Sequence, residues 1–366
     1  MKMRQGTIAA AAVVVGVAAL SPYSSAAGPV PAARITAAQA AAVTKLVRRE
    51  MATQKIPGLA IEVAVAGRTV YARGFGVRSP GQPVTNATIF PIGSITKQFT
   101  AGCVVLLAEQ HSLDLDSPVS RYLPKAPNGE RVTVRELLDQ TSGLADYTEQ
   151  PALQTAVGKD KLTKLEPERL LAMIARKPLK FKPGTRFEYS NTNYLLAGMI
   201  VEAVGGEPFG TFLREHLTEP IGLHSMQYLA TSIPAGSNVT RGYTMKDERF
   251  VLVPRITMSW AQGAGAIASD AHDLVEWDDA FFHGRVVAPN FVRTMTTAVK
   301  EDYGYGWVID RLRGERMVWH NGALPGAHAM NAFFPRSNME IVVLTNVVSA
   351  KPEAIAKEVR AIVARP

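Results

Sequence analysis

Ser94 and Lys97 are the two residues of this chain whose types and spacing most clearly suggest chemistry. On a helix, side chains three residues apart lie on one face, with their β-carbons about 5–6 Å apart. A serine hydroxyl becomes an effective nucleophile when a neighbouring base takes its proton, and an amine with a lowered pKa can be that base. The pair is a candidate nucleophile and base, although a helix cap followed by a surface lysine has the same pattern.

The residues before Ser94 indicate where its helix starts. Phe90-Pro91-Ile92-Gly93 cannot be helical through the proline, so we expect the helix to begin at or just before Ser94. Unpaired backbone N–H groups at a helix start favour developing negative charge, and the N–H of Ser94 would be one oxyanion donor. Cys103, the only cysteine, lies in the apolar stretch that follows and is expected to pack in the core, not to act as a thiol nucleophile.

Tyr189 and Asn191 form the only Tyr-x-Asn of the sequence, just before an apolar helix expected from Asn193 to Val204. Side chains two residues apart on an extended or turning segment point to the same side. A phenol beside a lysine can have its pKa lowered and carry a proton, whereas an amide can bind a substrate carbonyl and hold the lysine. The same two residues would also suit a helix cap and a packing tyrosine.

His320-Asn321-Gly322 follows a segment with strand character, Met317–Trp319. A glycine two positions after a polar side chain suits an edge strand that a substrate approaches closely, because no β-carbon blocks the contact. The N–H of the next residue, Ala323, would then be a second oxyanion donor. A histidine at a strand end before a turn is the alternative interpretation.

Ser94, Tyr189 and His320 each belong to a short motif that occurs once, in this order along the chain. With these motifs the sequence resembles the serine β-lactamase and penicillin-binding-protein-like superfamily, for which Ser-x-x-Lys is a signature. The resemblance is greatest to the branch with class C β-lactamases, D-alanyl-D-alanine carboxypeptidases, D-aminopeptidases and related carboxylesterases. Further segments that carry it are Thr88–Gly93, Leu137–Leu144, Phe181–Gly184, Gly263–Leu274 and Gly304–Trp307.

The resemblance implies a role for each matching residue. Ser94 would be the acylated nucleophile, Lys97 the base that takes its proton, and Tyr189 the acid and base for the leaving group and for deacylation. The implied substrate-binding residues are Asn191 for the acyl amide, His320 in place of the lysine of the usual Lys-Thr-Gly, and Gly322 with Ala323 at the oxyanion hole. No cofactor and no metal is implied.

The chain departs from the family pattern at its third motif. Class C β-lactamases generally carry Lys-Thr-Gly there, whereas this chain has His320-Asn321-Gly322. The hydroxyl that commonly binds a substrate carboxylate is absent at Asn321, and both changes weaken the hold on a β-lactam carboxylate. The sequence leaves open which group replaces that hydroxyl.

Composition and charge exclude several other classes of function. The chain has 366 residues, 47% hydrophobic and 20% charged, as expected of a globular enzyme with a large core. The formal charge of +8 is scattered, without an aromatic-interleaved basic stripe, so we expect no nucleic-acid partner. The seven histidines show no His-Glu-x-x-His, which argues against a zinc enzyme.

The N-terminus has the layout of a secretory signal peptide. Lys2 and Arg4 precede an uncharged run from Gly6 to Leu20, and small residues follow up to Ala27. The run is short for a membrane span of about 20 residues. We therefore expect a signal peptide over residues 1–27, a linker over 28–34, an exported (periplasmic or secreted) protein, and no stable membrane anchor.

Strand signals occur at both ends of the chain and helical signals between them. Strands are expected at 58–67, 68–77, 306–309, 316–320, 329–334 and 340–345, and terminal helices at 36–51 and 352–363. The predicted fold is α+β with two layers: a largely antiparallel sheet built from both chain ends, flanked by helices, like that of β-lactamases and DD-peptidases. The sheet-containing domain would take residues 35–88 and 301–366, and a mainly helical domain would take 89–300.

The predicted function is serine acyl transfer on an amide or ester. D-Ala-D-Ala-type peptides are the first substrate expectation, with cell-wall peptidoglycan as a candidate source, and a carboxylesterase or β-lactamase activity is the alternative. A Ser-His-Asp hydrolase with Gly-x-Ser-x-Gly is excluded because that pentapeptide is absent. A non-catalytic binder of cell-wall peptides is the remote alternative, since such a protein has no need of Ser94, Lys97, Tyr189 and Asn191 together.

Overall fold

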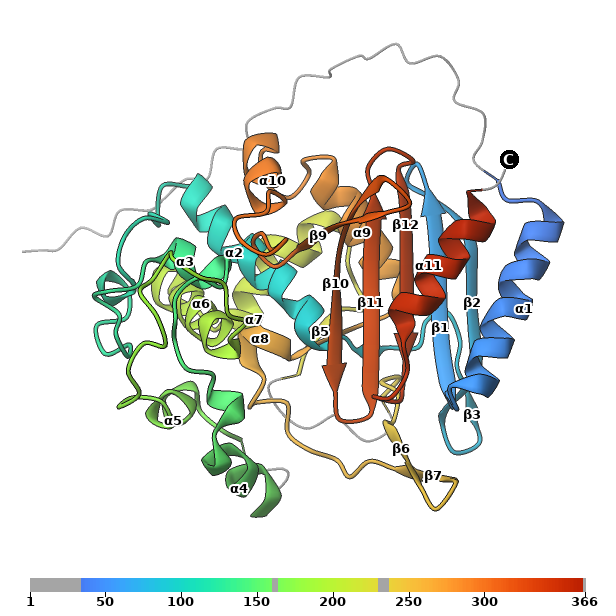
Figure 1. The fold of residues 1–366 in the computed structure, drawn as a ribbon, viewed down its shortest axis with the longest axis horizontal. Coiled ribbons are helices and arrows are strands. Elements are labelled where there is room, and N and C mark those ends of the chain that lie inside the picture. The colour runs from blue at the N-terminus through green and yellow to red at the C-terminus, as the bar shows by residue number, and fades with distance from the viewer. Residues whose placement is uncertain (1–33, 160–163, 230–236, 365–366) are drawn as a thin grey trace, which may run out of the picture. The chain divides into compact units, whose positions relative to one another are not determined.

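A seven-stranded antiparallel sheet with the order β3-β2-β1-β12-β11-β10-β9 is the centre of the structure, a computed structural model (Figure 1). The structure describes residues 34–159, 164–229 and 237–364. The predicted signal peptide lies outside these residues. The strands are β1 (Gly58–Val65), β2 (Arg68–Ser79), β3 (Gln82–Pro83), β9 (Val308–Leu312), β10 (Glu315–Leu324), β11 (Ala327–Phe334) and β12 (Met339–Thr345).

The sheet joins the two ends of the chain through β1 and β12, which pair antiparallel with Ile61 opposite Val343. Apolar side chains alternate along these strands between two faces, so each face has its own core. The fold prediction is confirmed, because the sheet is antiparallel and contains strands from both chain ends. The division into domains at residues 88 and 300 stays a prediction.

Helices cover both faces of the sheet (Figure 1). On one face, α1 (Ala37–Thr53) and α11 (Pro352–Val363) pack through residues such as Val47 and Val359 against Ile61 and Val343. On the other face, α9 (Ala271–Phe282) and α2 (Thr96–Glu109) share a larger core with Ala60 and Leu344. The remaining helices of this part are α3 (Val134–Leu138), α4 (Pro151–Lys159), α5 (Pro167–Ala172), α6 (Asn191–Gly205), α7 (Phe209–Phe212), α8 (Gln262–Gly265) and α10 (Pro289–Met295).

Helix α2 runs through the interior, with ten consecutive residues from Thr96 to Val105 buried. Cys103 is fully buried among them, as expected. A helix enclosed on all sides has little freedom to shift, so the residues at its start are held in place. Among the described residues, no helix combines the length and the apolar character needed to cross a bilayer.

Short strands within the mainly helical part were not expected from the sequence. Strands β4 (Phe90–Pro91), β8 (Ile267–Ser269) and β5 (Gln227–Tyr228) form a small sheet, and β6 (Tyr243–Lys246) pairs with β7 (Arg249–Leu252). Segments of two to four residues are too short to show a period in the sequence. The first of these sheets matters for the site, because β4 leads directly into the residues before Ser94.

Candidate active site

Ser94 lies in a 3-10 turn, Gly93–Ile95, that runs directly into α2. The predicted helix start is therefore correct in position, although its first residues have the tighter 3-10 geometry. Gly93 adopts a φ of 53°, a conformation that glycine takes without steric cost and that lets the chain turn sharply from β4 into the helix.

Lys97 is the best-connected side chain of the site, and its exposed fraction is 0%. Its Nζ lies 3.1 Å from Ser94 Oγ, 2.9 Å from Asn191 Oδ1 and 2.8 Å from the carbonyl oxygen of Ala264 in α8. Burial lowers the pKa of Lys97 to about 7, and the negative charge of Asp146 opposes this shift. A neutral Lys97 can donate to Asn191 and Ala264 and direct its lone pair at the hydroxyl of Ser94.

Asn191 is oriented by Asp146, a residue that sequence reasoning missed. Both the backbone N–H of Asn191, the first residue of α6, and its side-chain Nδ2 donate to Asp146 Oδ2, at 3.0 and 2.9 Å. The other carboxylate oxygen of Asp146 accepts from Thr148. Because Nδ2 is committed to a carboxylate, Oδ1 of Asn191 is the end that faces Lys97.

Tyr189 lies beside Lys97, with the Nζ of Lys97 4.8 Å from the centre of its ring, and its hydroxyl hydrogen-bonds with Ser94. The expectation that the lysine lowers the pKa of this phenol is wrong. Burial raises the pKa of Tyr189 above its usual value, and the hydrogen bond with Ser94 offsets the rise only in part. The phenol therefore stays protonated, so that it can donate a proton while Lys97 is the group able to accept one.

His320 is buried, with 3% of its surface exposed, and the centre of its ring lies 6.4 Å from that of Tyr189. Its Nδ1 faces the carbonyl oxygen of Asn321, and its Nε2 lies 3.1 Å from the hydroxyl of Tyr303. Burial and the nearby positive charge of Lys97 lower the pKa of His320 to about 3. The ring is thus neutral, with Nδ1 donating and Nε2 accepting, and it does not carry the charge of the lysine it replaces.

Asn321 lies on the opposite face of β10 from His320, as alternation along a strand requires. Its Nδ2 donates to Glu353 at the start of α11. Glu353 also lies 3.3 Å from Nε2 of His328. The side chain at the second position of the motif is therefore directed at a carboxylate in the structure and away from Ser94.

The N–H of Ala323 points to the open side of β10. Pro325-Gly326 joins β10 to β11 in a two-residue turn, so Leu324 and Ala327 form the hydrogen-bonded pair that closes it. Alternation then turns the N–H of Ala323 away from β11. Pairing of β9 with β10 ends at Trp319, so no strand in the described part of the chain pairs with this N–H.

Gly322 brings this edge against the nucleophile. A β-carbon at position 322 would lie 1.9 Å from the carbonyl oxygen of Ile92 and 2.6 Å from the backbone nitrogen of Ser94, which only glycine avoids. A β-carbon on Gly93 would lie 3.0 Å from the nitrogen of Ala323. The N–H groups of Ser94 and Ala323 are thus neighbours, as an oxyanion hole requires.

Ser94 lines a cleft with a volume of about 510 Å³. Of the site residues predicted from the sequence, three line this cleft, namely Ser94, Asn191 and Ala323. The other four, Lys97, Tyr189, His320 and Gly322, are not among its lining residues. Its other described lining residues are Tyr147, Thr148, Leu153, Gln154, Val157, Ile256, Trp260, Ala261, Ala264, Gly265, Leu324 and Pro325. A larger cavity of about 640 Å³, lined by Lys164, Glu202 and Tyr228 among others, does not include Ser94.

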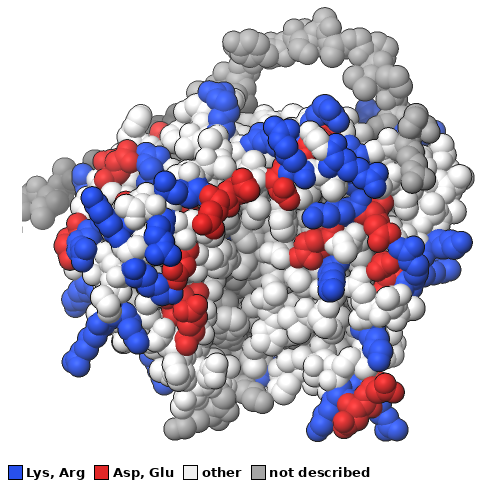
Figure 2. Space-filling model, in the orientation of Figure 1, with Lys and Arg blue, Asp and Glu red and all other residues white. Residues whose placement is uncertain are grey.

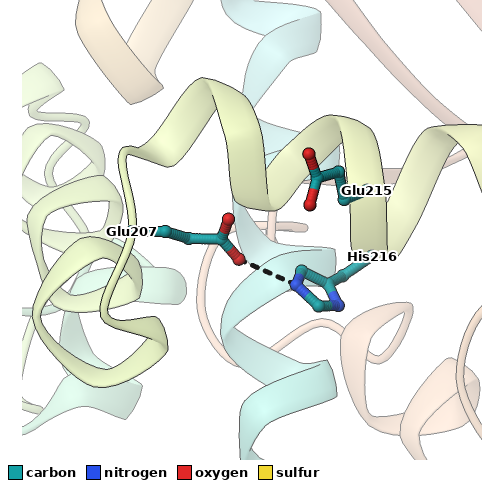
Figure 3. Close-up of side chains that lie close together, drawn as sticks. All are labelled: Glu207, Glu215 and His216. Carbon is teal, nitrogen blue, oxygen red and sulfur yellow. Dashed lines mark hydrogen bonds and ion pairs between the residues drawn. The ribbon is translucent and has the colours of Figure 1, made fainter.

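Glu207, Glu215 and His216 form the one group in the described part of the chain that brings three metal-ligating side chains together (Figure 3). His216 Nε2 lies 2.8 Å from Glu207 Oε1, and both Glu215 and His216 are exposed. None of the three lines the cleft at Ser94. Nothing in this group connects it with the chemistry of the site.

The fold and this arrangement of serine, lysine and tyrosine define a serine hydrolase with the β-lactamase fold. Residues 43–365 match the model of the Beta-lactamase family, and the chain belongs to that family. The resemblance stated from the sequence motifs is therefore confirmed.

Similar proteins include hydrolases and penicillin-binding proteins. The D-aminopeptidase of Brucella anthropi is 30% identical over 298 residues, covering 78% of this chain and 55% of that protein. Among solved structures, a D-stereospecific amidohydrolase from Streptomyces sp. is 26% identical with a TM-score of 0.77, covering 86% and 97% of the two chains. The octameric penicillin-binding protein homologue from Pyrococcus abyssi is 29% identical with a TM-score of 0.78, covering 88% and 76%.

The matched part is shorter than the full-length relatives. Across eight curated relatives, the matched region spans between 52% and 68% of the relative's own length. The chain thus spans about half to two thirds of the length of these relatives.

Proposed function

We propose that this chain is an exported serine hydrolase that cleaves an amide or ester through an acyl-enzyme on Ser94. The observation that carries the proposal is the position of Lys97, buried, with its pKa near 7 and its Nζ 3.1 Å from Ser94 Oγ. A base that is partly unprotonated at neutral pH and aimed at a hydroxyl is what a serine nucleophile needs.

The acylation step follows from these contacts. Ser94 Oγ forms a bond to the substrate carbonyl carbon while its proton passes to Lys97, and the carbonyl oxygen takes the negative charge between the N–H groups of Ser94 and Ala323. The protonated Tyr189 then donates to the leaving nitrogen or oxygen as the bond to carbon breaks, and Lys97 returns the proton to Tyr189.

Deacylation reverses the proton transfers. Water adds to the acyl carbon, giving up a proton through Tyr189 and Lys97, and Ser94 regains its proton as the acid product leaves. Asn191, held by Asp146, keeps Lys97 oriented and is the group proposed to bind an acyl amide.

D-amino-acid peptides are the proposed substrate class, with peptidoglycan stem peptides of D-Ala-D-Ala type as the first source to test. The similarity to D-aminopeptidases and to a D-stereospecific amidohydrolase supports this choice. An ester is the second candidate, favoured by the apolar cleft wall formed by Leu153, Val157 and Trp260. Export is proposed from residues 1–27 and is tested by N-terminal sequencing of protein recovered from outside the cytoplasm.

The nucleophile is tested by trapping the acyl-enzyme. The protein is incubated with p-nitrophenyl acetate or a labelled penicillin and digested, and the adduct is located by mass spectrometry. We expect it on the peptide that contains Ser94, and we expect none in Ser94→Ala, whereas the exposed Ser112→Ala control behaves like the wild type. An adduct elsewhere, or binding without any turnover, contradicts the proposal.

A further inference from the structure

The cleft at Ser94 is uncharged wherever the structure describes its lining. None of the described residues that line the cleft is Lys, Arg, His, Asp or Glu. Figure 2 shows a mostly white, hollowed strip between the mainly helical part and β10, whereas coloured side chains gather above it and at the margins. From this we infer that the cleft selects substrates without a carboxylate near the scissile bond, that is, amides and esters in which that end is uncharged. This inference rests on the proposed function and narrows its substrate class: it favours amides and esters of D-amino acids, and it makes D-Ala-D-Ala peptides, whose terminal carboxylate adjoins the scissile bond, the poorer substrates.

Lys97, whose partners Ser94 and Asn191 line the cleft, has no capacity left for a carboxylate. Lys97 has no exposed surface, and an ammonium group has three protons. Ser94 Oγ, Asn191 Oδ1 and the carbonyl oxygen of Ala264 already take all three. A substrate carboxylate that captured Lys97 would also hold it protonated and remove the base from the reaction.

The third motif does not supply a cation either. His320 is 3% exposed, and both of its ring nitrogens have partners inside the protein. The amide of Asn321 is committed to Glu353 on the opposite face of β10. The two positions that correspond to the lysine and the hydroxyl of Lys-Thr-Gly, already expected to hold a carboxylate weakly, are therefore closed to a substrate carboxylate.

An uncharged cleft selects between substrates through the free-energy cost of removing their charged groups from water. A carboxylate that leaves water for an apolar cleft loses its hydration and gains no opposite charge in return, whereas a neutral amide or ester loses far less. Leu153, Val157, Ile256 and Trp260 instead offer apolar contacts along the cleft. We expect the neutral member of a matched substrate pair to be preferred by about 100-fold in kcat/KM, the scale at which an unpaired polar group is rejected.

Two arginines lie just outside the cleft and define the rival outcome. Arg241 and Arg255 line a smaller pocket of about 50 Å³ that shares Ile256, Leu324 and Pro325 with the cleft. A carboxylate held there would be separated from Ser94 by the turn after β10.

The test uses two substrates that differ only in charge, acetyl-D-alanyl-D-alanine and acetyl-D-alanyl-D-alaninamide, with the full chain. We expect the amide to have the higher kcat/KM. If the free acid is cleaved equally well or better, the inference is wrong, and loss of that activity in Arg255→Gln then assigns the carboxylate to the neighbouring pocket. If neither is cleaved, the same comparison is made with p-nitrophenyl butyrate and p-nitrophenyl succinate, which bears a free carboxylate.

A pair of variants at the exposed cleft residue Gln154 checks the cause. Gln154→Lys should raise the ratio of acid to amide kcat/KM by about threefold at low salt, and Gln154→Glu should lower it, since exposed charges act weakly and are screened by salt. Equal ratios in both variants contradict a role for cleft charge. Failure of the proposed function has a different signature, because Ser94 then forms no adduct with any neutral ester.

Discussion

Gly322 lies against the backbone of Ser94 so closely that a β-carbon at position 322 would stand 2.6 Å from the nitrogen of Ser94. This contact joins the third motif of the sequence to the first. It also sets the separation between the two N–H groups proposed to hold the oxyanion.

Gly322→Ala should therefore reduce kcat/KM for a neutral ester by about 10²–10³-fold, the effect of losing an oxyanion donor. The added methyl group has to displace Ile92 or Ser94, and both are backbone contacts. Gly198→Ala in α6 is the matched control, because its β-carbon would meet neighbours at 3.5 Å or more, and we expect full activity and equal or higher Tm. Full activity in Gly322→Ala would show that the β10 edge takes no part in catalysis.

The pH dependence of kcat/KM should report Lys97. Its neutral form is the active one, so activity rises with pH and levels off above the pKa of Lys97, about 7. Lys97→Met should lower the rate by about 10²–10⁴-fold and remove this acid limb. A profile that is flat from pH 5 to pH 8 in the wild type would contradict Lys97 as the base.

Asp146→Asn should affect both the rate and the pH profile. Its charge raises the pKa of Lys97, so removing that charge should move the acid limb to lower pH. The substitution also replaces one of the two acceptor oxygens by an NH2 donor, so Thr148 and Asn191 can no longer both be satisfied, and we expect kcat to fall about 10–100-fold because Lys97 is less well positioned. Asp116→Asn, which breaks an exposed pair with Arg135, is the control and should leave the pH midpoint unchanged.

The burial of Glu340, away from the active site, should make the free energy of unfolding depend on pH. Its two carboxylate oxygens are buried without a hydrogen-bond partner among the described residues, and burial together with the charge of Asp279 raises its pKa to about 8. Because the folded pKa lies above the unfolded one, the favourable contribution is complete below about pH 4 and is lost as pH rises through 8. Glu340→Gln should remove this loss.

Urea unfolding at pH 6 and pH 9 measures the effect. The wild type should lose about 2–4 kcal/mol more than Glu340→Gln between these two pH values, since each pKa unit corresponds to about 1.4 kcal/mol. Glu358→Gln, at an exposed position paired with Arg49, should change stability by less than about 1 kcal/mol. Equal pH slopes for wild type and Glu340→Gln would contradict the raised pKa.

The sequence was sufficient to predict the elements and motifs whose pattern lies within a short segment. The segment 352–363 has the period of an amphipathic helix, and α11 has those bounds; the strands near 329–334 and 340–345 likewise match β11 and β12. The motifs predicted the residues that surround Lys97, because spacing within each motif survives folding. Ser94 and Asn191 both contact the Nζ of Lys97, although 97 positions separate them in the sequence.

The parts that sequence reasoning missed depend on tertiary contacts. Asp146 contacts Asn191 across 45 residues, and no local pattern marks it as a partner. The predicted direction of the Tyr189 pKa shift was wrong because burial, which sequence spacing does not reveal, is the largest contribution and raises this pKa. The outward turn of Asn321 toward Glu353 depends on where α11 packs.

The contact between Ser94 and Gly322 of β10 affects when the protein becomes active during its synthesis. A chain made only as far as residue 300 contains Ser94, Lys97, Tyr189 and Asn191, but not the strand that carries Ala323. Strand β10 is linked to β1 through β11 and β12. We therefore expect β12, the last strand in the sequence, to pair before the N–H of Ala323 is held beside Ser94. The incomplete polypeptide thus contains the nucleophile and its base but lacks one of the two oxyanion donors. We expect it to become active only after the N-terminal and C-terminal strands have paired.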